Sequence, residues 1–114
     1  MATLQILNQE PITMSELRAA LEKVKKRDGE LNFRANKTEE HLNNMPLLKP
    51  KEAKELVQKL TALDIPRLKP EHVVKIVDLL PVSLEELKVI ISGYSVTVNS
   101  DNCKKIIDMV SGYV

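Results

Sequence analysis

The side chains that most often perform catalysis or bind metals are few in this sequence. They are His41, His72 and Cys103, and no catalytic pair or zinc site has their spacing. The adjacent glutamates at 39–40 and at 85–86 point about 100° apart on a helix, so neither pair can act as a general acid and base on one substrate. The sequence therefore predicts no catalytic residues, no metal site and no cofactor.

Sequence features that bind phosphate or nucleic acid are also scarce. The three glycines stand alone at positions 29, 93 and 112, so the chain lacks a glycine-rich phosphate-binding loop. The formal net charge is only +1, and one Phe with two Tyr is too few for a surface that stacks bases. We therefore expect that holding nucleic acid is not the main function of the chain.

A basic cluster formed by Lys23, Lys25, Lys26 and Arg27 is the exception, and the last three are the candidate RNA contacts. It ends a helix predicted from about 14 to 27, where cations complement the helix dipole. We interpret the cluster as a solvated helix end, and weak contact with RNA is the alternative.

The length and composition indicate one protein domain in the cytoplasm. The chain has 114 residues, and its longest apolar runs are about three residues, far short of the roughly 20 that span a bilayer. The N-terminus lacks the pattern of a secretory signal, and the single cysteine suits a reducing compartment.

The most apolar stretch covers residues 68–92. On a helix beginning at Pro70, apolar side chains span an arc of roughly 220° and leave Glu71, Lys75 and Asp78 for solvent. The apolar residues are Val73, Val74, Ile76, Val77, Leu79 and Leu80. Such a helix must be covered on more than one side. Pro81 should end it, and Ser83 with Glu86 forms a capping box that begins another helix.

The remaining chain predicts further helices and one strand. Thr13 and Glu16 form a second capping box, before a helix with a core stripe of Leu17, Ala20, Leu21 and Val24. Weaker or shorter helices follow over about 32–45, from Pro50, and over about 101–112, where Cys103 occupies a core position. The fold class is therefore all-α, with about six helices and one short N-terminal strand.

The predicted strand covers residues 3–9 and places Leu4 and Ile6 on one face. A lone strand is not stable, so this segment is either a frayed terminus or a strand that adds to the sheet of another chain.

Residues 48–114 resemble RpoF, the F subunit of the archaeal RNA polymerase stalk and the counterpart of the fourth subunit of eukaryotic RNA polymerase II. The resemblance is carried by EAKELV at 52–57, VKIVDLLP at 74–81 and Glu86-Leu87, and the chain end has IID at 106–108 with Tyr113. Over residues 1–47 the resemblance is limited to the general sequence pattern.

The resemblance implies an HRDC-like helical domain over 48–114 and a partner-binding strand with two helices over 1–47. The chain would be non-catalytic. It would form a heterodimer with the E subunit of the stalk, join the polymerase core, and support promoter opening and the handling of nascent RNA, which the E subunit mainly binds. The expected contacts with the E subunit are Leu4, Ile6, Leu17, Leu21, Val24, Val74 and Leu79.

Two other functions fit the same helices. A free-standing HRDC-type domain would bind DNA or RNA by itself, with an affinity that falls steeply as salt rises. An unrelated helical adaptor would bind neither nucleic acid nor polymerase.

Overall fold

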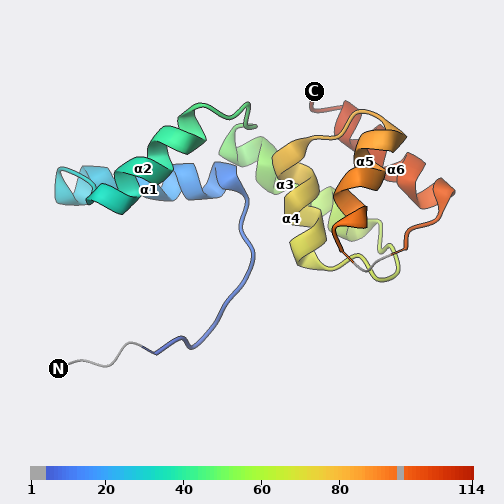
Figure 1. Cartoon of the computed structure of the whole chain (residues 1–114), viewed down its shortest axis with the longest axis horizontal. Helices are drawn as coiled ribbons and strands as arrows, with labels where there is room; N and C mark the ends of the chain where they lie inside the picture. The colour runs from blue at the N-terminus through green and yellow to red at the C-terminus, as the bar shows by residue number, and fades with distance from the viewer. Residues whose placement is uncertain (1–4, 95–96) are drawn as a thin grey trace.

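The computed structural model describes residues 5–94 and 97–114, and its regular elements in these ranges are all helices (Figure 1). The six helices are α1 (Met14–Asp28), α2 (Phe33–Asn43), α3 (Pro50–Ala62), α4 (Pro70–Leu79), α5 (Leu84–Ser92) and α6 (Ser100–Ser111). The prediction of an all-α chain with about six helices is confirmed. None of these described helices is long and apolar enough to cross a membrane.

The strand predicted over residues 3–9 is not formed by its described part. Residues 5–9 have no regular secondary structure, and Leu4 lies outside the described residues. A strand needs a neighbour to pair its backbone N–H and C=O groups, and the described ranges contain no strand that could provide this pairing. Figure 1 shows the segment leaving the helices as a single trace.

The helices form two groups (Figure 1). α1 and α2 lie side by side as a hairpin, and α3 to α6 form a bundle next to it. Gly29 makes the turn of the hairpin with φ of +83°, and its N–H donates to the carbonyl of Lys25 at 2.8 Å. Only glycine adopts this left-handed conformation without a steric penalty. α3 connects the groups because it packs against both α1 and α4.

The hydrophobic core belongs to the bundle. Each of its four helices contributes a side chain that is 0% exposed, namely Leu56, Ile76, Leu87 and Ile106. Cys103 is buried in the same core, which confirms its prediction as a small core residue. At about 25 cal/mol per Å² of apolar surface, this burial is the main source of stability for the fold.

The stop between α4 and α5 follows the sequence prediction. Leu80 leaves the helix with φ of 48° and ψ of 62°, and Pro81 follows it in a buried position. The Ser83 hydroxyl accepts the N–H of Glu86 at 3.2 Å, and the Glu86 carboxylate accepts the N–H of Val82 at 2.9 Å. Proline and the Ser83 cap together end one helix and begin the next. The second bond of the predicted capping box differs, because the Glu86 carboxylate reaches the N–H of Val82 and not that of Ser83.

Side-chain caps begin two other helices, and the cap of α1 was predicted. The Thr13 hydroxyl accepts the N–H of Glu16 at 3.1 Å at the start of α1. Asn99 caps α6 by accepting the N–H of Asn102 at 2.8 Å. These bonds satisfy donors that an α-helix leaves free in its first turn.

Candidate functional site

Two long-range hydrogen bonds hold the start of α1 against the bundle. The Met14 N–H donates to Asp78 Oδ1 on α4 at 2.8 Å. The hydroxyl of Ser15, which is buried, donates to the carbonyl of Leu48, just before α3. We call these four residues the N-terminal clamp. The clamp fixes the point from which the chain continues toward its N-terminus.

The position of Asp78 contradicts the sequence prediction, which expected this residue to face solvent. Its carboxyl group is half-buried, and burial raises its pKa above the ordinary value. The N–H of Met14 and the charge of Lys75 act in the opposite direction, because both favour the carboxylate. Glu71 and Lys75, which were also expected to face solvent, are exposed.

Residues 5–12, which we call the N-terminal arm, present apolar side chains without cover. Ile6 is 75% exposed, Leu7 is 88% exposed and Ile12 is 45% exposed. A shallow cavity is lined by residues 8–11 together with Glu71, so the arm passes the first turn of α4. Exposed apolar residues gathered on a short segment are a common feature of protein interaction sites.

The predicted contact residues on α1 share one stripe. Leu17, Leu21 and Val24 are spaced by four and three residues, and each is half-buried. Ala20, which was predicted in the same core stripe, is exposed instead. α1 packs against α2 and α3, so the chain itself covers part of this helix. A binding protein would reach only the uncovered part of the stripe.

The predicted contact residues on α4 do not form one patch. Val74 and Leu79 are five residues apart, which places them about 140° apart around the helix. Val74 is half-buried and lies between Glu71 and Asp78, on the side of α4 that faces the arm and the clamp. Leu79 points elsewhere and is 44% exposed.

The sequence prediction missed two exposed apolar residues that follow Leu79 in the chain. Val82 is 51% exposed in the turn after α4, and Val89 is 73% exposed on α5. Glu86 lies between them, since it accepts the N–H of Val82 and precedes Val89 by one helical turn. The exposure of Val89 could have been predicted from the sequence, because Val89 is an apolar residue outside the core stripe of its helix.

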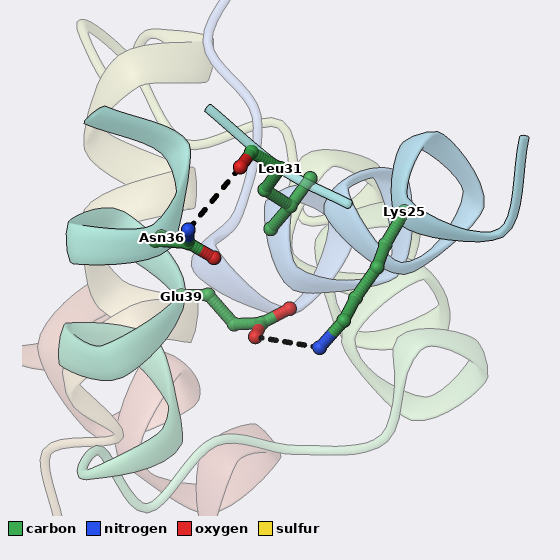
Figure 2. A network of polar contacts seen from close by, with 4 residues as sticks. All are labelled: Lys25, Leu31, Asn36 and Glu39. Atoms are coloured by element: carbon green, nitrogen blue, oxygen red, sulfur yellow. Dashed lines mark hydrogen bonds and ion pairs between the residues drawn. The ribbon is translucent and has the colours of Figure 1, made fainter. Parts of the chain in front are cut away.

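The basic cluster at the end of α1 is partly neutralised within the hairpin. Figure 2 shows Lys25 Nζ directed to Glu39 Oε1 on α2, at 3.4 Å. Arg27 pairs with Asp28 at 2.8 Å, and their hydrogen bond raises the pKa of Arg27 and lowers that of Asp28. Lys26 is exposed and makes no ion pair among the described residues.

A polar contact at the start of α2 supports the same hairpin (Figure 2). The side-chain amide of Asn36 donates to the carbonyl of Leu31 at 3.2 Å. Leu31 is 6% exposed, so this bond satisfies a carbonyl group on a buried residue of the connecting loop. These contacts hold the basic end of α1 in place against α2.

The histidines have structural surroundings. His72 is buried, its Nδ1 accepts the N–H of Lys69 at 3.0 Å, and its ring packs edge-on against Tyr94 at 4.5 Å. His41 is exposed on α2. In the part of the chain that the structure describes, no three His, Cys, Asp or Glu side chains gather as metal ligands would.

Comparison with known families gives a match over most of the chain. A family model described as RNA polymerase Rpb4 matches residues 23–114, which include the end of α1 and all of α2 to α6. The arm and the first turns of α1 lie outside the matched region. No curated protein matches the chain. The family match covers most of the chain and agrees with the resemblance in its bundle, so this protein belongs to the RNA polymerase Rpb4 family of non-catalytic polymerase subunits.

Proposed function

We propose that this protein is the RpoF-type stalk component of an archaeal DNA-directed RNA polymerase, bound to the E subunit as a heterodimer. The family match supports a polymerase subunit. The N-terminal arm supports a protein partner, because Ile6 and Leu7 are 75% and 88% exposed on a segment whose base is held by the clamp. Anchoring the base reduces the entropy that the arm loses on binding.

The arm would bind by adding a strand to a sheet of the E subunit. Its backbone N–H and C=O groups in residues 5–9 form no ladder within the described chain. Alternation places Leu4 and Ile6 on one face, where both would be buried against the E subunit. The uncovered part of Leu17, Leu21 and Val24 would extend the contact along α1.

Val74 would join this contact from α4, since it lies on the side near the arm. Leu79 would make a separate contact, because it lies about 140° away around α4. In the whole polymerase this second contact would be with the E subunit or with the core.

The bundle would act as a rigid support for the stalk. We assign an HRDC-like fold to residues 48–114, and a partner-binding function to residues 1–47. In the cytoplasm the heterodimer would support promoter opening together with transcription factor E. It would also help to hold nascent RNA, mainly through the E subunit, because this chain has a net charge of only +1.

A pair of variants in the arm tests the proposal. Ile6→Asp places a charge on the face that would be buried, whereas Gln5→Asp introduces the same charge on the opposite face. We expect Ile6→Asp to weaken binding to the purified E subunit by about tenfold or more, and Gln5→Asp to change it by less than about threefold. Isothermal titration calorimetry measures both.

Deletion of residues 1–10 should weaken binding at least as much as Ile6→Asp. Equal affinity of the deletion variant and the full chain would contradict the role of the arm. Circular dichroism controls for folding, since the deletion leaves the clamp and all described helices in place.

A further inference from the structure

A groove separate from the arm runs between α1 and the start of α3. Small side chains from Ala19 and Ala20 form part of its α1 wall, and the first turns of α3 form the other. Its lining residues are Glu16, Ala19, Ala20, Lys23, Pro50, Lys51 and Lys54. Alanines leave room for close approach of another backbone, so the groove can receive a short segment of another chain.

Positive side chains outnumber negative ones in the lining of the groove. Lys23, Lys51 and Lys54 line it, against the single carboxylate of Glu16. None of the three lysines makes an ion pair with a residue in 5–94 or 97–114. By contrast, Lys25 and Lys59 each pair with a glutamate.

The chemistry of the walls favours a protein over a nucleic acid. A single strand would need aromatic side chains on which its bases could stack, and no lining residue is aromatic. Glu16 would also repel a phosphate backbone. Ala19, Ala20 and the lysine stems can instead pack against apolar side chains, which matters because exposed ion pairs are weak by themselves.

From this geometry we propose that the α1–α3 groove docks an acidic segment of a partner protein. Carboxylates of the segment pair with Lys23, Lys51 and Lys54, and small or apolar side chains between them lie on Ala19 and Ala20. The groove is distinct from the arm, so this contact does not depend on strand addition to the E subunit.

Photo-crosslinking tests the occupant directly. The probe is p-benzoylphenylalanine in place of Ala20, in the tagged full chain expressed in its own cells. After irradiation and purification, mass spectrometry identifies the crosslinked peptide. We expect a segment of another protein with several Asp or Glu residues and apolar residues between them.

Charge reversal provides the matched control. Lys51→Glu with Lys54→Glu should reduce the crosslink yield about tenfold. Lys104→Glu with Lys105→Glu makes the same charge change on exposed residues of α6 and should leave the yield unchanged. Circular dichroism spectra of both double variants check that the helices are retained.

Several outcomes would overturn this assignment. They are a crosslink to a neutral or basic segment, a nuclease-sensitive adduct, a crosslink to a second copy of this chain, no crosslink at all, and a yield that Lys51→Glu with Lys54→Glu does not change. Co-purification of polymerase subunits is scored separately in the same sample, so a failure of the polymerase assignment is distinguishable from a failure of the groove.

Discussion

Asp78 connects two parts of the chain that are 64 residues apart. Its carboxylate accepts the N–H of Met14, one of the donors that α1 leaves free in its first turn. A negative group is favourable there because the helix dipole is positive at that end. The same group is half-buried, and its desolvation opposes this gain.

The raised pKa of Asp78 sets the direction of a pH effect. A carboxyl group whose pKa is higher in the folded state binds its proton more tightly there than in the unfolded chain. Its contribution to stability is therefore fully present below the unfolded pKa of about 3.9, and is lost as the pH rises through the folded pKa. Asp78→Asn keeps an acceptor for Met14 and removes the titration.

We expect the free energy of unfolding of the wild type to fall relative to Asp78→Asn between about pH 4 and neutrality. The change should be at most about 1 kcal/mol, since solvent screens a half-buried group. Urea denaturation at several pH values measures it, and Asp108→Asn on the exposed side of α6 is the control. If the free energy of unfolding of the wild type instead rises with pH relative to that of Asp78→Asn, the predicted direction of the pH effect is wrong.

Arg67 is a second residue with a measurable consequence. Its φ is +67°, a left-handed conformation that costs a non-glycine residue about 1–2 kcal/mol. Arg67→Gly removes that cost but increases the entropy of the unfolded chain, so a net stabilisation of up to about 1 kcal/mol is expected. Arg34→Gly, inside α2, should instead destabilise by about 1 kcal/mol. Urea denaturation compares the two variants with the wild type, and a loss of stability in Arg67→Gly would contradict the reasoning.

At the scale of elements, the helices that carry local signals were predictable. Pro81 and the Ser83 cap indicated the boundary of α4 and α5, and Thr13 indicated the start of α1. The clamp was not predictable, because its bonds join residues 64 and 33 apart in sequence. No local pattern reports which distant carboxylate will reach a helix start, so Asp78 was assigned to solvent.

The candidate site divides in the same way. Ile6 was predictable from alternation and composition, and its exposure agrees with a role at an interface. Val74 and Leu79 were grouped because both lie outside the main stripe of α4, although simple helix geometry separates them. The partial neutralisation of the basic cluster required the α1–α2 pairing, which brings Glu39 to Lys25.

The end of α1 yields a prediction about RNA. If the basic cluster contacts nascent transcript, Lys26 should carry most of the contact, because Lys25 and Arg27 already pair with acidic residues. Lys26→Ala should then reduce RNA crosslinking in the assembled polymerase more than Lys25→Ala does, by about twofold or more. The triple variant combines Lys25→Ala, Lys26→Ala and Arg27→Ala. Unchanged RNA crosslinking in this variant would show that the cluster is only a solvated helix end.

At the scale of the whole molecule, burial is unequal between the two helical groups (Figure 1). The bundle has a continuous core, whereas α1 and α2 contain only Ser15 and Leu42 as buried residues. The hairpin and the arm therefore offer apolar surface that a binding protein can cover. This division fits a polymerase component that folds around one core and binds through its N-terminal part.

The most direct test of the central claim is affinity purification of the tagged chain from its own cells, followed by mass spectrometry. A stalk component predicts that the large polymerase subunits and the E subunit elute with the chain in near-equal amounts. Ile6→Asp should reduce that yield, while Gln5→Asp should not. Elution of the wild-type chain without polymerase subunits would contradict the assignment.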